Sequence, residues 1–271
     1  MKPIMRTSSI LLVIAYSLIA CTTSPLNRRQ IVIYSEAEMA QRGEQTYRQM
    51  RQELPISADT RETQYIQCIA DYVVTALEPA ERGNYVWEVT VFNDEQANAF
   101  ALPGGKIGVY NGLLDVAVTQ HQMASVIAHE VGHVLANHSN ERASQAALRN
   151  VGLAAAQILG ASSSTIEAID VGSRYGIFLP FNRTQESEAD AIGVQLMARA
   201  GFDPEASIIL WQNMMATGGP SPPQLLSTHP SPASRMNELR ELMEPALAIR
   251  NSANSRGINP DCAVPENNLQ F

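Results

Sequence analysis

The chain has 271 residues, of which 45% are hydrophobic and 17% are charged, and its formal net charge at pH 7 is -8. This is an ordinary globular composition, and the length suffices for one hydrophobic core with a small appendage. The acidic balance, with no basic stretches interleaved with aromatic residues, argues against a nucleic-acid-binding protein.

The first twenty residues indicate a targeting segment. They begin with basic residues, and residues 10–20 form an apolar run that has the length of a signal peptide and is too short to span a membrane. The run ends in Leu-Ile-Ala before Cys21, which resembles a bacterial lipobox. We therefore expect residues 1–20 to be a lipoprotein signal peptide and Cys21 to carry lipid; the alternative is an ordinary signal peptide with an incidental cysteine. The residue after Cys21 is Thr22 and not Asp. By resemblance to Gram-negative lipoproteins, the absence of Asp at this position favours the periplasmic side of the outer membrane over retention at the inner membrane.

Two further cysteines, Cys68 and Cys262, remain if Cys21 is lipidated. An even pair in an oxidising compartment of the cell envelope predicts one disulfide. Two unrelated buried thiols are the alternative.

The rest of the chain is expected to form a lipid-anchored tether over residues 21–35, a folded domain over residues 36–250 and an irregular Asn- and Pro-rich tail over residues 251–271. Periodic apolar residues predict helices over residues 36–54, 63–77, 139–160, 183–200, 204–215 and 231–247, and a short helix over 113–116. β-branched and aromatic residues predict strands over residues 85–92, 98–102 and 106–110. Residues 165–179 fit no assignment. Many helices and a small sheet make this an α+β protein.

An H-E-x-x-H motif at residues 129–133 carries the strongest functional signal. Apolar residues recur around it at helical spacing, and Thr119 with Gln122 fits a capping box at the start of that helix. On a helix, His129 and His133 project from one face, one turn apart, and can share a zinc ion. Glu130 lies beside them, where it can take a proton from zinc-bound water. We expect one catalytic zinc ion per chain; the alternative is a structural pair of histidines.

A catalytic zinc site of this kind needs a third protein ligand. The metzincin pattern fails, because Ala136 and Ser139 stand where it needs Gly and His. His138 is one residue early for that pattern. We expect it to have a structural role near the end of the motif helix, where an imidazolium would suit the helix dipole.

The helix over residues 183–200 offers a better source of the third ligand. Its Glu186 and Asp190 fall within roughly 40° of each other, whereas Glu188 points about 200° away from Glu186 and is expected to be solvated. Glu186 can bind the metal, and Asp190 can accept a hydrogen bond from a ligand histidine. From the residues alone, an exposed charged face is an equal alternative.

Four blocks in this order resemble the HtpX and CAAX prenyl protease family of zinc peptidases, peptidase family M-forty-eight or the minigluzincins. They are the segment NAFALPGG at 98–105, the H-E-x-x-H motif, the segment ESEAD with AIG after it at 186–193, and Thr228-His229-Pro230 with Arg235 downstream. The match runs from about residue 85 to residue 242. The chain looks most like the Oma-type and bacterial lipoprotein members, because it shows neither the long apolar spans of the membrane members nor a C-terminal helical repeat domain.

The resemblance implies a mainly helical zincin-type peptidase domain with a small sheet beside the motif helix. It also implies that His129, His133 and Glu186 bind the zinc ion and that Glu130 is the general base. Asp190 is then not a ligand itself but accepts a hydrogen bond from a ligand histidine.

The same resemblance implies that Asn98 lies in an edge strand that pairs with substrate backbone, and that His229 lies near the metal. Either residue could steady the oxyanion. For His229 the alternative is a turn residue before Pro230, and for Arg235 it is a surface arginine rather than a residue that supports the ligands. Because imidazole binds zinc well, we also expect His229 to be a fourth ligand that holds the resting enzyme latent.

The predicted function is that of a zinc-dependent endopeptidase of the bacterial cell envelope that degrades misfolded or unassembled envelope proteins. The alternative is a chaperone-like or assembly-factor lipoprotein that binds such proteins and retains zinc with little or latent proteolysis. An intact Glu130 favours the enzyme, since binding alone requires no general base. The predicted partners are these proteins and, through the lipid, the membrane, with no nucleic acid.

Overall fold

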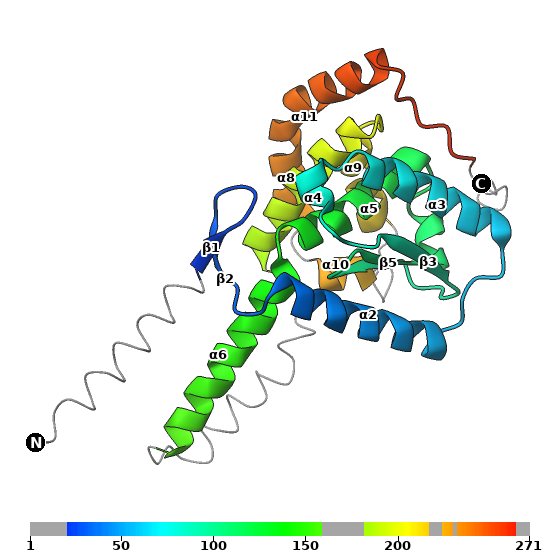
Figure 1. The fold of residues 1–271 in the computed structure, drawn as a ribbon. Helices are drawn as coiled ribbons and strands as arrows, with labels where there is room; N and C mark the ends of the chain where they lie inside the picture. Colours follow the sequence, from blue (N-terminus) through cyan, green and yellow to red (C-terminus); the bar gives the residue numbers. More distant parts are fainter. Residues whose placement is uncertain (1–20, 159–181, 217–223, 230–231, 264–271) are drawn as a thin grey trace, which may run out of the picture. The chain divides into compact units, whose positions relative to one another are not determined.

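Figure 1 shows the computed structural model, which describes residues 21–158, 182–216, 224–229 and 232–263. The expected signal peptide, the unassigned stretch 165–179 and the loop expected at 218–223 lie outside the described residues. The chain divides into unit 1, residues 1–35 and 137–179, and unit 2, residues 36–136 and 180–271. Among the helices that the structure describes, none combines the length and the apolar character needed to cross a membrane.

Unit 1 contains a β-hairpin and one long helix. Strands β1 (Cys21–Thr23) and β2 (Arg29–Ile31) pair antiparallel, and α6 (His138–Ile158) lies against them. Arg28 donates two hydrogen bonds of 2.8 Å to the buried carboxylate of Glu141 on α6, and the backbone N–H of Ile33 donates to Ser144 Oγ at 2.8 Å. Part of the segment 21–35, which was expected to be a tether, is therefore ordered, because its residues form hydrogen bonds with α6 residues that are distant in sequence.

The expected place of His138 is corrected by the structure. The motif helix ends at Leu135, and His138 is instead the first residue of α6, where its side chain is fully buried. Asn137, just before it, has φ 54°, which separates the two helices. At the N-terminus of a helix the dipole disfavours an imidazolium, so the expected dipole interaction does not apply.

Unit 2 contains a three-stranded sheet of β3 (Glu88–Phe92), β4 (Ala99–Leu102) and β5 (Lys106–Tyr110), in the order β3-β5-β4. β3 runs parallel to β5, with Glu88 opposite Lys106, and β4 runs antiparallel to β5. Gly104 and Gly105 make the turn between β4 and β5 at φ 89° and 85°. β4 is thus an edge strand, and it lies beside the motif helix.

Most helices of unit 2 follow the predicted pattern, with bounds that differ by a few residues at most ends, but two short helices, over residues 79–82 and 224–228, were not predicted. They are α2 (Glu36–Glu53), α3 (Thr60–Thr75), α4 (Pro79–Arg82), η1 (Asn111–Asp115), α5 (Gln120–Leu135), α8 (Arg183–Arg199), α9 (Ala206–Ala216), α10 (Gln224–Thr228) and α11 (Pro232–Ser255). The last helix extends beyond its predicted end at residue 247. The predicted α+β class is confirmed.

The motif helix α5 is the centre of unit 2. The predicted capping box is present: Thr119 Oγ1 accepts from the N–H of Gln122, whose side chain accepts from the N–H of Thr119. Every residue from Gln122 to Val134 is buried, because α3, α8, α9 and β4 all pack against this helix. Burial on all sides explains why a helix of sixteen residues with a weak polar face is stable here.

Two glycines let α5 and α8 cross closely. A Cβ added at Gly132 on α5 would lie 2.8 Å from the carbonyl oxygen of Ala189, and one added at Gly193 on α8 would lie 2.9 Å from the backbone N and Cα of His129. Real Cβ atoms essentially never approach other atoms so closely. The close crossing therefore depends on glycine at both positions, and it brings Glu186 next to the motif histidines.

A disulfide joins α3 to the C-terminal segment. Cys68 and Cys262 have an S–S distance of 2.01 Å and a Cα–Cα distance of 5.9 Å. The side-chain amide of Gln120, the first residue of α5, accepts from the N–H of Cys262 at 2.9 Å and donates to the carbonyl of Pro260 at 3.1 Å. The irregular segment after α11 is therefore held against the start of the motif helix.

Candidate metal centre

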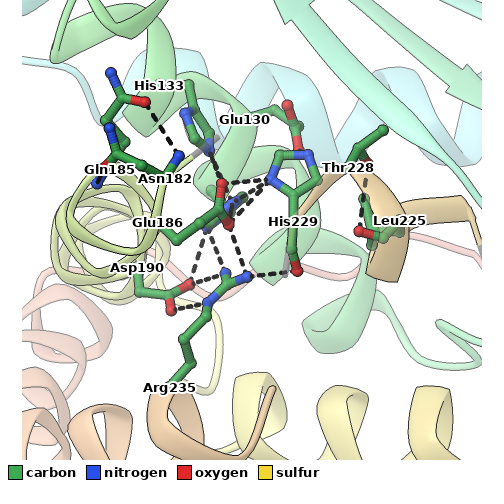
Figure 2. Close-up of polar contacts among 11 residues, drawn as sticks. Glu130, His133, Asn182, Gln185, Glu186, Asp190, Leu225, Thr228, His229 and Arg235 are labelled. Carbon is green, nitrogen blue, oxygen red and sulfur yellow. Dashed lines mark hydrogen bonds and ion pairs between the residues drawn. The ribbon is translucent and has the colours of Figure 1, made fainter. Parts of the chain in front are cut away.

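Four side chains converge on one point inside unit 2 (Figure 2). His129 and His133 come from α5, Glu186 from the first turn of α8, and His229 from the position after α10. One ligand atom of each lies within 4.8 Å of the others. α10 positions His229, whose N–H donates to the carbonyl of Leu225 at 2.9 Å. The three elements thus bring together residues that are up to 100 positions apart in the sequence.

The distances within this cluster fit a four-coordinate zinc ion. His129 Nε2 lies 3.0 Å from His133 Nε2, 3.2 Å from His229 Nδ1 and 3.5 Å from Glu186 Oε2. His133 Nε2 lies 3.4 Å from Glu186 Oε1, and His229 Nδ1 lies 3.0 Å from the same oxygen. Ligand atoms at about 2.0–2.1 Å from a tetrahedral zinc ion are separated by roughly 3.3 Å. Imidazole and carboxylate are also ligands that zinc prefers in proteins, so the donors and their spacing both suit it.

Glu130 lies beside the cluster and is not part of it. Its side chain is buried, and its Oε1 lies 3.3 Å from Nε2 of His229 and makes no hydrogen bond among the described residues. Burial raises the pKa of Glu130 above its ordinary value, because the charged form loses its hydration. A carboxylate with a raised pKa and a free oxygen is well suited to accept and return a proton near neutral pH.

Asp190 and Arg235 support the cluster from the other side. Asp190 Oδ1 lies 2.9 Å from Nδ1 of His129, which orients the Nε2 of that ring toward the other ligands. Arg235 donates to both oxygens of Asp190 at 2.6 and 2.7 Å, and its Nη1 lies 2.7 Å from Glu186 Oε2. The same Nη1 donates to the carbonyl of His229 at 3.2 Å. Arg235 is 1% exposed, so the alternative of a surface arginine is wrong.

The pKa values of the cluster follow from burial and charge. Burial favours the neutral forms, but hydrogen bonds to Asp190 and Glu186 outweigh it and raise the pKa of His129 to about 9. Burial likewise works against the charged forms of Glu186 and Asp190. Hydrogen bonds from His129 and His229 nevertheless hold the pKa of Glu186 below its ordinary value, and the charge of Arg235 does so for Asp190. Both carboxylates are therefore ionised at neutral pH.

One expectation for α8 is wrong. Glu188 was expected to be solvated, yet it is 4% exposed. Its angular position relative to Glu186 is as expected from helix geometry, but α8 is buried on more than the face that carries Glu186 and Asp190. Helical spacing gives the direction of a side chain and does not reveal what covers it.

Two other residues near the site need comment. Asn98 lies directly before the edge strand β4, and its side-chain oxygen is buried without a hydrogen-bond partner among the described residues. No sequence pattern indicated Trp211 on α9, whose ring centroid lies 4.1 Å from the guanidinium carbon of Arg235. Trp211, Glu130, His229 and Arg235 all line one cavity that adjoins the cluster. The sequence around a single tryptophan in an apolar helix is the same whether the ring packs in the hydrophobic core or beside a functional site.

Comparison with known proteins agrees with this geometry. The family model described as "Peptidase family M48" matches residues 60–243. The "Mitochondrial metalloendopeptidase OMA1" of Schizosaccharomyces pombe is 38% identical over 170 residues, which are 62% of this chain and 50% of that protein. The bovine "Metalloendopeptidase OMA1, mitochondrial" is 35% identical over 197 residues, 68% of this chain and 37% of that protein. The "Beta-barrel assembly-enhancing protease" of Escherichia coli strain K12 is 30% identical over 211 residues, 74% of this chain and 42% of that protein. The chain thus spans half or less of the length of these curated relatives.

Proposed function

Because the chain belongs to peptidase family M48, we propose that it is a zinc-dependent endopeptidase of the bacterial cell envelope. The observation that carries the proposal is the convergence of His129, His133 and Glu186 on one point with Glu130 directly beside it. A site that only binds zinc needs the three ligands. The additional buried carboxylate, with an oxygen that makes no hydrogen bond, is what hydrolysis requires.

In this proposal His129, His133 and Glu186 hold the metal, and Asp190 and Arg235 keep their donor atoms in place. When bound, zinc supplies an activated water and polarises the scissile carbonyl. Glu130 takes a proton at its side-chain oxygen and later gives it to the leaving amine. Its raised pKa brings proton uptake and release closer to neutral pH.

His229 is proposed to have two roles that depend on its position. Its Nδ1 lies among the donor atoms, 3.0 Å from Glu186 Oε1, and its Nε2 faces Glu130 at 3.3 Å. In this arrangement the ring would act as the fourth ligand of a bound zinc ion and would restrain the enzyme at rest. If the ring leaves that position, the same imidazole lies near enough to donate to an oxyanion.

Asn98 and the edge strand β4 are proposed to bind substrate. β5 covers one side of β4, and the order β3-β5-β4 leaves the other edge of the described sheet unpaired. An extended substrate segment can add there as a further strand, with Asn98 at its end. The unsatisfied side-chain oxygen of Asn98 is then available to a backbone N–H of the substrate.

The finer assignment to the HtpX and CAAX prenyl protease group and to its lipoprotein subgroup is also part of the proposal. It rests on the lipobox-like residues before Cys21 and on the ordered motif blocks. We propose lipid attachment at Cys21, residence on the periplasmic side of the outer membrane, and misfolded or unassembled envelope proteins as substrates. The matched relatives include mitochondrial proteins, so the envelope location rests on the N-terminal residues of this chain.

One experiment separates the enzyme from the chaperone-like alternative. The zinc-loaded protein and its Glu130→Gln variant are incubated with unfolded envelope proteins, the products are analysed by mass, and zinc content is measured in parallel. We expect the parent to produce internal cleavages and the variant to keep zinc but to produce none. Absence of internal cleavage both by the zinc-loaded parent and by its His229→Ala variant, with substrate still bound, would favour the chaperone-like alternative.

A further inference from the structure

The guanidinium of Arg235 meets the metal centre with its edge. Its Nε and Nη2 donate to the two oxygens of Asp190, and its Nη1 lies 2.7 Å from Glu186 Oε2 and donates to the carbonyl of His229 (Figure 2). The N–H groups of a guanidinium all point outward in the plane of the group. One planar side chain therefore orients the proposed ligand Glu186 and also Asp190, which in turn orients His129. The position of both carboxylates depends on the angle at which this plane is held.

The faces of the same guanidinium carry no N–H and need a different kind of partner. The guanidinium carbon lies over the indole ring of Trp211, 4.1 Å from the ring centroid. Because the edge of the group is directed at the carboxylates, the ring is met by a face. The two side chains are only 1% and 5% exposed. An aromatic face attracts a cation, and the attraction is larger when both groups are withdrawn from water.

The surroundings of Arg235 leave room for its side chain to move. Arg235 lines the cavity that adjoins the metal centre, and the aliphatic side chains of Val126, Val194 and Leu210 line the same cavity. Aliphatic side chains cannot attract a cation, and an arginine side chain has several rotatable bonds whose freedom is lost when it is held in one position. Trp211 is on α9, which packs against α11, the helix that carries Arg235. An attractive flat ring at this position restricts rotation of the guanidinium into the cavity.

We propose that Trp211 is a positioning residue of the metal centre, whose indole ring fixes the plane of the Arg235 guanidinium and thereby the carboxylates of Glu186 and Asp190. This rests on the proposed function, because these carboxylates serve the zinc ion named there. Trp211 acts through Arg235 and takes no part in proton transfer. Without the ring the donor atoms remain present, but their positions are held less closely, and zinc binding is weakened.

Three variants on α9 test this proposal in the full-length protein. Trp211→Leu removes the aromatic face, and Trp211→Phe retains a smaller one. Leu210→Ala is the control, because it removes buried apolar volume beside the same cavity from a side chain that cannot attract a cation. Competition with a chelator measures zinc affinity, and thermal unfolding measures stability. Cobalt(II) in place of zinc reports the geometry of the ligands through its visible absorption.

We expect Trp211→Leu to bind zinc roughly 10-fold more weakly, the lower end of what loss of a group behind the ligands costs, and to change the cobalt spectrum. Trp211→Phe should keep zinc affinity within about threefold of the parent, because a phenyl face also attracts a cation. Leu210→Ala should unfold at a lower temperature and bind zinc like the parent. Where Trp211→Leu does not fold, Trp211→Met takes its place with the same expected loss, since methionine fills irregular space without an aromatic face.

Three results would overturn the proposal. One is an equal loss of zinc affinity in Leu210→Ala and Trp211→Leu, because packing in the core would then explain both. Another is a loss in Trp211→Phe as large as that in Trp211→Leu, since the aromatic face would then be irrelevant. The third is zinc affinity and a cobalt spectrum like those of the parent in Trp211→Leu.

The link through Arg235 is tested in an Arg235→Lys background, which keeps the charge but loses the planar fork. There Trp211→Leu should lower zinc affinity by less than about twofold, because the effects of two residues that act as a unit do not add. A full 10-fold loss in that background would contradict the proposed link.

The zinc and cobalt measurements need no substrate, so they separate this proposal from that of the peptidase. A parent protein that binds zinc and cleaves nothing would refute the peptidase and leave the role of Trp211 to the affinities. A parent that cleaves, with a Trp211→Leu variant that binds zinc equally well, would refute the role of Trp211 and leave the peptidase intact.

Discussion

Replacement of Gly193 by alanine should weaken zinc binding although residue 193 does not contact the metal. The new Cβ would lie 2.9 Å from the backbone N and Cα of His129, whereas ordinary contacts begin at 3.4 Å. The helices α5 and α8 must therefore separate by about 0.5 Å (3.4 minus 2.9), which is the tolerance within which a functional site must be held. Overpacking of this kind costs about 1–3 kcal/mol, and Gly→Ala in a helix returns about 0.5–1 kcal/mol. We expect a net loss of about 1–2 kcal/mol in stability and a roughly 10- to 100-fold loss in zinc affinity.

Competition with a chelator measures the affinity, and thermal unfolding with and without zinc measures the stability. Gly152→Ala is the matched control, because nothing lies within 4 Å of a Cβ added there on α6. It should be neutral or slightly stabilising and should leave zinc affinity unchanged. Parent-like zinc affinity in Gly193→Ala would refute the idea that the close crossing of α5 and α8 sets the ligand geometry.

Three further predictions concern single side chains. Glu186→Ala should lose zinc and activity, whereas Glu188→Ala should keep zinc but unfold at a lower temperature, as metal analysis and thermal unfolding would show; the opposite pattern would contradict the ligand assignment. Cys68→Ser should lower the free energy of unfolding by roughly 2–5 kcal/mol in denaturant titrations, and thiol labelling of the native parent should find neither Cys68 nor Cys262. His229→Ala should change peptidase rates, upward if the ring restrains the enzyme and downward if it mainly supports the oxyanion; unaltered kinetics would leave His229 as a turn residue.

Local sequence signals located the parts of the site that lie on single helices. The capping box at Thr119 and the apolar periodicity after it gave the start and type of α5, because both are short-range properties of the chain. Helix geometry likewise placed Glu186 and Asp190 on one face of α8, and the structure has both at the cluster. Each of these inferences needed only the 3.6-residue repeat of one helix.

Properties that depend on a second element escaped this reasoning. Glu188 has the sequence context of an exposed charge and is buried, because the far face of α8 is also covered. Trp211 lies under Arg235 only because α9 and α11 meet there, and no spacing within either helix indicates it. The importance of Gly193 is visible only once α5 lies against it. In each case the missing information is the identity of the neighbour.

The charge of the site gives a separate reason to expect a divalent cation in it. Three buried carboxylates, those of Glu130, Glu186 and Asp190, lie around one buried guanidinium, that of Arg235. With neutral histidines and all three carboxylates ionised, which for Glu130 is the form that acts as a base, this leaves a formal charge of -2 (one minus three) in a region withdrawn from water, and buried charge is costly unless it is compensated. Protonation of His129, whose pKa is raised to about 9, removes only part of that excess. A zinc ion removes all of it while the histidines stay neutral, as zinc ligands must be. The arrangement that supports the ligands therefore also selects the charge of the metal.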